Sequence, residues 1–164
     1  MVISSHFIAG AALGKATGNP ILAVVFGFVL HFVMDLVPHW NYGYKHLKKV
    51  KTLLLVLMDP LLAFALYLTI GLIRGYSAST WLVTFLGGFF CALPDLIEFF
   101  IRVFNIKPLI FFLKFHRAVH WFDPHPENIW ATAEDEIQFT KKGTFFGILY
   151  QIPFVIIAIY FLLH

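Results

Sequence analysis

The sequence predicts an all-α fold, a polytopic integral membrane bundle of about four spanning helices with further short or re-entrant helices. Of the 164 residues, 60% are hydrophobic and only 13% are charged, against about 45–50% and about 25% in soluble domains. Long apolar stretches recur along the chain, and none alternates polar and apolar residues as a half-buried strand would. This composition excludes an ordinary soluble enzyme, a disordered chain and a nucleic-acid module with a basic surface.

The length is that of one domain, so we expect a single membrane domain over residues 1–164. It should contain six helical segments and one polar loop. The expected helices lie at about residues 3–13, 20–37, 47–73, 80–104, 108–122 and 144–163, and the polar loop at 123–142.

The first segment, 3–13, is apolar but shorter than the roughly 20 residues that a span requires. Small residues at its end favour close packing against another helix: Ala9, Gly10, Ala11, Ala12 and Gly14. Residues 15–19 resemble a turn, and Pro20 suits the first position of the second helix.

The segments at 47–73 and 80–104 are long enough to span with some tilt. The segment at 108–122 is shorter and carries Lys114 and Arg117, which indicates a re-entrant or interfacial position. The segment at 144–163 is the last span, and Pro153 should kink it.

The basic residues predict the orientation. Ten of the twelve fall on one side of the predicted bundle, leaving only Lys15 and Arg74 for the other. Cytoplasmic loops carry an excess of Lys and Arg, so we expect the lysine-rich loops in the cytoplasm and the chain in the inner membrane of a prokaryote. The ten are Lys45, Lys48, Lys49, Lys51, Arg102, Lys107, Lys114, Arg117, Lys141 and Lys142.

Four acidic residues lie in apolar segments: Asp35, Asp59, Asp95 and Glu98. An acid at mid-membrane costs about 2.5–3.5 kcal/mol on insertion scales, so each needs a compensating partner. Glu98 has Arg102 four residues later on the same helix. The three aspartates have no basic residue within one turn, which points to another kind of partner.

Histidines supply that partner. His31 and Asp35 stand four apart, which places them on one helix face, and His39 follows on the same face if the helix continues. The predicted topology brings these residues to the same end of the bundle as Asp95. Other imidazoles expected at that end are His6, His116 and His120.

Imidazoles and carboxylates gathered in apolar surroundings predict a divalent metal site. This donor set suits Zn²⁺ best, with Mn²⁺ or Fe²⁺ as alternatives, and does not suit Ca²⁺. The single Cys91 excludes a multi-cysteine zinc cage. The predicted ligands are His6, His31, Asp35, His39, Asp95, His116 and His120.

A faint internal echo runs at a constant offset of sixty residues. The segment 27–36 shares Gly, Asp and Leu with 87–96, as Gly27/Gly87, Asp35/Asp95 and Leu36/Leu96. Membrane folds do use internal repeats.

Four short motifs are spread over most of residues 5–121: Ser5-His6, His31-x-x-x-Asp35, Leu93-Pro94-Asp95 with Glu98, and His116-Arg117-x-x-His120. Together they resemble the motifs of the YdjM-like family of membrane-bound metal-dependent hydrolases. The spacing of the last histidine pair, the place of the second acid and the early position of the His-x-x-x-Asp motif depart from the family's pattern. The resemblance implies a metal-dependent hydrolase. Helical His-x-x-x-Asp pairs also occur in zinc-dependent phospholipase C and related nucleases, an analogy only.

The favoured interpretation is an enzyme, a metal-dependent hydrolase at the cytoplasmic face. It would cleave a phosphoester of a lipid or membrane-associated substrate, with membrane lipid as its partner and no nucleic acid. Asp35, Asp59 or Glu98 would accept a proton, and Arg117 or Arg102 would hold an anionic group.

Two alternatives remain open at the level of the sequence. One is a non-catalytic membrane protein that binds or transports a metal with the same side chains. The other is a b-type haem bundle with two axial histidines, which would leave three membrane-embedded acids without a role. An open coordination position would favour catalysis, and a closed one a structural metal.

Overall fold

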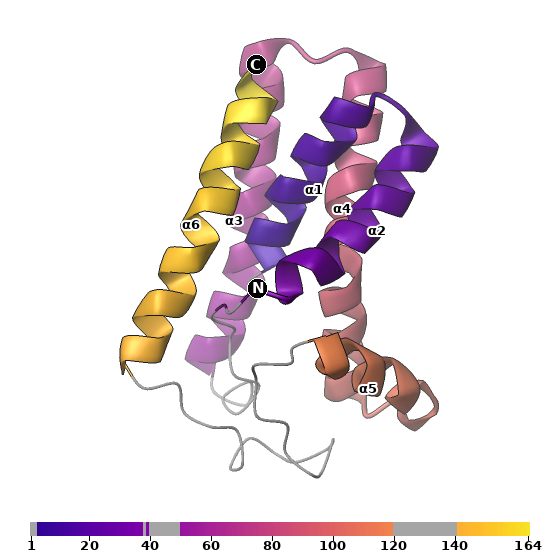
Figure 1. Cartoon of the computed structure of the whole chain (residues 1–164), viewed down its shortest axis with the longest axis vertical. Helices are drawn as coiled ribbons and strands as arrows, with labels where there is room; N and C mark the ends of the chain where they lie inside the picture. The colour runs from indigo at the N-terminus through magenta and orange to yellow at the C-terminus, as the bar shows by residue number, and fades with distance from the viewer. Residues whose placement is uncertain (1–2, 38, 40–49, 120–140) are drawn as a thin grey trace.

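The computed structural model describes residues 3–37, 39, 50–119 and 141–164, and every regular element in this part of the chain is a helix (Figure 1). The prediction of an all-α fold is confirmed. The elements are α1 (Ile3–Thr17), α2 (Pro20–Asp35), α3 (Val50–Arg74), α4 (Ala78–Phe104), the short 3₁₀ turn η2 (Lys107–Leu109), α5 (Ile110–Val119) and α6 (Lys141–Leu163).

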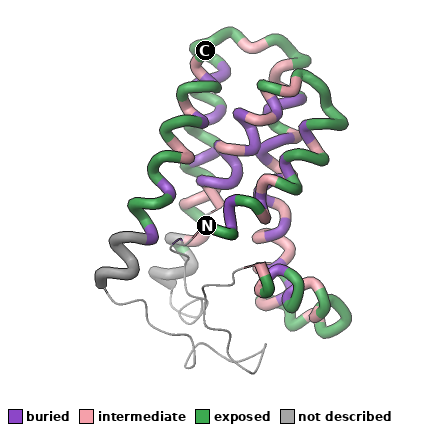
Figure 2. Tube along the Cα trace, viewed as in Figure 1, coloured by how far each residue is buried: buried purple, intermediate pink, exposed green. Residues whose placement is uncertain are grey.

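The first helix is the centre of the bundle. It packs against α2, α3, α4 and α6, and most of its side chains are buried (Figures 1 and 2). A helix of small residues takes this position because neighbouring backbones can approach it closely. A Cβ on Gly10 would collide with Gly87, and one on Gly14 would collide with Val83, so α1 and α4 are in backbone contact.

The second and fourth helices cross at a pair of glycines. A Cβ on Gly27 would lie 2.6 Å from the carbonyl oxygen of Gly87. The two helices run in the same direction from this crossing (Figure 1). The predicted echo at an offset of sixty residues thus corresponds to two parallel helices that touch at equivalent glycines.

The observed helix ends follow local chemistry. The first helix continues to Thr17, one turn beyond the predicted end at 13, because nothing before Gly18 breaks it, and Gly18 then adopts φ +58°. Asn19 caps α2 by accepting the N–H of Ile21 at 2.9 Å, with Pro20 in the first turn as predicted.

The fourth helix begins two residues earlier than predicted, at Ala78. The side chain of Ser77 caps it by accepting the N–H of Thr80. At the other end of α4, Asn105 adopts the left-handed conformation with φ 52° and terminates the helix. Pro60, Pro94 and Pro153 all lie inside continuous helices.

Polar side chains also form contacts between the helices. Tyr67 donates its hydroxyl proton to the carbonyl of Trp81 at 3.0 Å, and Ser5 donates to Gln151 Oε1 at 3.2 Å. At the opposite end of the bundle, Lys15 donates to the carbonyls of Phe161 and Leu162, the last turn of α6. A cation suits this position because the last carbonyls of a helix have no partner within it.

Two helices among the described residues are long and apolar enough to cross a membrane. They are Val56–Arg74 within α3 and Ala78–Phe104, which is α4. Pro20–Asp35 and Gly147–Leu163 are apolar but shorter. The polar loop predicted at 123–142 lies outside the described residues as far as residue 140, and residues 141 and 142 already belong to α6.

Candidate metal centre

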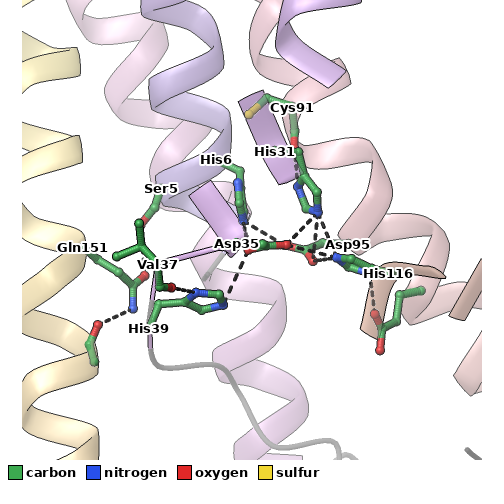
Figure 3. Close-up of polar contacts among 12 residues, drawn as sticks. Ser5, His6, His31, Asp35, Val37, His39, Cys91, Asp95, His116 and Gln151 are labelled. Atoms are coloured by element: carbon green, nitrogen blue, oxygen red, sulfur yellow. Dashed lines mark hydrogen bonds and ion pairs between the residues drawn. The ribbon is translucent and has the colours of Figure 1, made fainter. Parts of the chain in front are cut away.

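Three helices bring histidines and aspartates together at one end of the bundle (Figure 3). The start of α1 supplies His6, the end of α2 supplies His31 and Asp35, and α4 supplies Asp95. One ligand atom from each of these four residues lies within 4.8 Å of all the others, so the group could hold a metal ion. Two further histidines lie at the edges of this group. His39 follows the end of α2, and His116 belongs to α5.

Asp35 is the centre of the cluster and is fully buried. Its Oδ1 lies 3.2 Å from His6 Nε2 and 3.5 Å from His39 Nε2. Its Oδ2 lies 3.0 Å from His31 Nε2 and 3.1 Å from His116 Nε2. Each oxygen therefore faces two imidazole nitrogens.

Asp95 faces the same imidazoles from α4. Its Oδ2 lies 3.6 Å from His6 Nε2, and its Oδ1 lies 3.9 Å from His31 Nε2 and 3.7 Å from His116 Nε2. The Asp95 side chain is 15% exposed, whereas Asp35, His6 and His31 are fully buried. Asp95 is thus the member of the four-residue group that solvent reaches.

Three of the histidines are oriented through their Nδ1 atoms. His31 donates Nδ1–H to the carbonyl of Cys91 at 2.8 Å, and His39 donates Nδ1–H to the carbonyl of Val37 at 2.6 Å. His116 places Nδ1 2.6 Å from Oε2 of Glu98. A carbonyl or carboxylate has no proton to give, so Nδ1 carries the proton in each ring and Nε2 is the nitrogen that can bind a metal.

The carbonyl of Cys91 orients His31 from α4. Cys91 lies one turn before Asp95 on the same helix, and its carbonyl accepts the Nδ1 proton of His31 at 2.8 Å. One turn of α4 therefore orients a histidine and presents a carboxylate.

His6 has the least satisfied environment. Its side chain is fully buried, and among the described residues neither of its ring nitrogens has a hydrogen-bond partner. Leaving a polar group buried without a partner costs about 1–3 kcal/mol. A cation between His6 Nε2 and the two aspartates would remove that cost.

Glu98 lies beside the cluster and makes two contacts. Arg102 Nε and Nη2 each approach Glu98 Oε1 to 2.7 Å, which confirms the predicted pair four residues apart. The other oxygen of Glu98 faces His116. Burial lowers the pKa of His116, but its contacts with Asp35 and Glu98 outweigh burial and raise the pKa from 6.5 to about 10.

The structure brings together every predicted ligand except His120, which lies outside the described residues. Among the predicted catalytic residues, Asp35 is in the cluster and Glu98 is beside it. Asp59 is engaged elsewhere, since its Oδ2 accepts the N–H of Ser4 at 3.0 Å at the start of α1. Arg117 is half-buried in α5, next to His116.

Sequence reasoning missed the two backbone carbonyls that orient His31 and His39. A carbonyl belongs to every residue, so its role as an acceptor has no signature in the sequence. The sequence prediction grouped Asp59 with the other acids. The contact of Asp59 with Ser4 depends on how α1 packs against α3, which the sequence alone does not show.

No family model matches this chain, and neither a curated protein nor a solved structure does.

Proposed function

We propose that the protein is an integral membrane, metal-dependent hydrolase that cleaves a phosphoester of a lipid or membrane-associated substrate. The residues that suggest it are those that resemble the YdjM-like family, and all of them except His120 lie in or beside the cluster in the described part of the chain. We further propose that the cluster lies at the cytoplasmic end of four spanning helices.

The observation that carries the metal site is the buried imidazole of His6. It faces two carboxylates at 3.2 and 3.6 Å without a hydrogen bond among the described residues. Donors bound to one tetrahedral Zn²⁺ at about 2.0–2.1 Å lie about 3.3 Å from each other. The separations around Asp35 are close to that value, so an ion fits with small side-chain shifts.

The surface of the helices supports a lipid environment. Only 28% of the Val56–Arg74 window and 44% of the Ala78–Phe104 window is buried, unlike the core helix of a soluble protein. Large apolar side chains cover the outside of α2, α3 and α6, such as Ile21, Leu61, Leu72 and Ile156. Exposed apolar surface of this extent is rare on soluble monomers.

The positions of the basic residues support the orientation. Lys15 and Arg74 end α1 and α3 at one end of the bundle, away from the cluster. Arg102, Lys107 and Lys114 lie near the cluster end, on α4, η2 and α5. Cytoplasmic loops carry the excess of positive charge, so the cluster would face the cytoplasm.

The chemistry follows from the donor set. A bound divalent ion supplies a nucleophilic hydroxide near neutral pH by lowering the pKa of a bound water to about 7. Hydrolysis adds the water oxygen to phosphorus and releases the ester oxygen as an alcohol. Glu98 is the candidate to accept the water proton, because it is a carboxylate beside the cluster that is not among the proposed ligands. Arg117 is the candidate to hold the phosphate charge.

The test is a metal-reconstitution assay on full-length protein in detergent. Stripped protein receives Zn²⁺, Mn²⁺ or Fe²⁺ and is screened against phospholipids and generic phosphoesters. We expect turnover that Asp35→Asn abolishes with little loss of thermal stability. His164→Ala is the matched control, because His164 is exposed at the end of α6 and bonds only the carbonyl of Tyr160 among the described residues. Protein that binds metal but turns over no phosphoester contradicts the hydrolase.

A non-catalytic metal site is the second candidate, and the burial of His6, His31 and Asp35 favours it. A structural site is closed by protein ligands, whereas a catalytic site keeps a position for water. Full coordination by side chains, seen by X-ray absorption of the zinc-loaded protein, would select this alternative.

A further inference from the structure

The contacts around Asp35 divide the cluster into two similar halves. The His6 half contains Asp35 Oδ1, Asp95 Oδ2 and the Nε2 atoms of His6 and His39. The His31 half contains Asp35 Oδ2, Asp95 Oδ1 and the Nε2 atoms of His31 and His116. Figure 3 shows the two pairs of imidazoles on opposite sides of the Asp35 carboxylate.

We propose that the cluster is a dinuclear metal centre in which Asp35 and Asp95 bridge two divalent ions. Each ion would take two imidazole nitrogens and one oxygen from each carboxylate. This inference rests on the proposed metal site and specifies its number of ions.

The donor count supports two ions. Four histidines and two carboxylates provide eight donor atoms, four for each of two ions. A five-coordinate ion would then keep one position for water. Two-metal sites in hydrolases hold their ions about 3.5–4 Å apart, a separation that a carboxylate spans with one oxygen on each ion. A single ion held by His6, His31, Asp35 and Asp95 would leave the Nε2 atoms of His39 and His116 without a metal.

The charges support the same conclusion. In the His31 half, His31 Nε2 and His116 Nε2 are 2.9 Å apart, and both face oxygens of Asp35 and Asp95. In the His6 half, His6 Nε2 faces both aspartates without a hydrogen bond among the described residues. Two aspartates in apolar surroundings need compensating positive charge, which one divalent ion in each half would supply.

The helix geometry explains why both carboxylates can bridge. Asp35 lies eight residues after Gly27, and Asp95 lies eight residues after Gly87. Since α2 and α4 touch at these glycines and run in the same direction, both carboxylates reach the same level, about 12 Å from the crossing. The two halves of the cluster therefore lie between two equivalent acids.

The test counts the ions and asks whether they interact. Stripped full-length protein is loaded with Mn²⁺, the bound manganese is counted by mass spectrometry, and its electron paramagnetic resonance spectrum is recorded. We expect two ions per chain and a spin-coupled spectrum. One ion per chain with an uncoupled six-line spectrum overturns the dinuclear centre and leaves the proposed hydrolase intact, whereas no bound ion overturns both.

Variants assign the ions to the halves. His39→Gln should remove the ion of the His6 half, and His116→Gln that of the His31 half. Each should lower the count from two to one and abolish the spin coupling. His164→Ala should retain two coupled ions. Loss of both ions from either variant, in protein whose circular dichroism matches the wild type, contradicts independent halves bridged by the aspartates.

Discussion

His31 donates its Nδ1 proton to the carbonyl oxygen of Cys91, sixty residues further along the chain, and thereby turns Nε2 toward Asp35. The contact joins equivalent positions of two parallel helices that also touch at Gly27 and Gly87. One packing arrangement therefore orients a ligand on α2 and aligns the acids of both helices.

His6→Ala should weaken metal binding by more than the roughly 10–100-fold that loss of an outer-shell partner causes. It should change the thermal stability of the metal-free protein little, because the cavity cost is offset by removal of a buried imidazole without a hydrogen bond among the described residues. Metal titration followed by calorimetry measures the affinity, and thermal unfolding in chelator measures the stability. Unchanged metal affinity would exclude His6 as a ligand.

Glu98→Gln should lower metal affinity about 10–100-fold, as expected for an outer-shell residue that positions a ligand. It keeps the size of the side chain but weakens the contacts of this residue with His116 and with Arg102. Arg102→Gln, which leaves the contact between Glu98 and His116 in place, is the matched control. If it affects metal affinity as strongly as Glu98→Gln, the contact with His116 is not what matters.

The metal-free protein should lose stability as the pH rises from about 7 toward 10. Burial opposes the charge on His116, but Asp35, Glu98 and Asp95 favour it, so the folded-state pKa is about 10 against an ordinary 6.5. A raised pKa gives stability that is complete below 6.5 and is lost as pH rises through about 10. Melting temperatures in chelator across this range test it, and His116→Gln should remove this part of the dependence.

Asp59→Asn should retain activity, whereas Asp59→Ala should destabilise the protein by about 0.5–2 kcal/mol, the usual cost of losing a cap at a helix start. Asparagine keeps an oxygen that can accept the N–H of Ser4, and alanine does not. Melting temperatures and phosphoester turnover of the two variants separate the roles. Loss of turnover in a stable Asp59→Asn protein would restore Asp59 as a proton acceptor.

Gly27→Leu should destabilise the bundle by about 1–3 kcal/mol or more, because its side chain would overlap the backbone of α4. It should also weaken metal binding, although residue 27 is not a ligand and lies one turn before His31. Val25→Leu, on the exposed face of α2, should change neither property. Thermal unfolding and metal titration of both variants provide the comparison.

The sequence was sufficient to predict the helices and the meeting of the ligands. The lengths of the apolar segments identify the helices. Because α3 runs away from the end of α2 and α4 runs back, His31, Asp35 and Asp95 come to the same end of the bundle. The four-residue spacings within α2 and α4 identify the pairs that share a helix face, including Glu98 with Arg102.

The remaining features depend on how the helices rotate and slide against each other. The partner of His31 is a backbone carbonyl, the partner of Asp59 is the N–H of Ser4, and the second contact of Glu98 is His116. Each of these contacts joins two helices, so the spacing of residues within one helix cannot predict it. The division of the cluster into two halves is visible only once these rotations are fixed.

The contact between Gly27 and Gly87 fixes how α2 and α4 are positioned along each other. A slide of one helix along the other moves its carboxylate by the same amount, about 1.5 Å for one residue of rise. The relative position of the two carboxylates is thus determined at Gly27 and Gly87, two turns from either aspartate and by residues that carry no side chain.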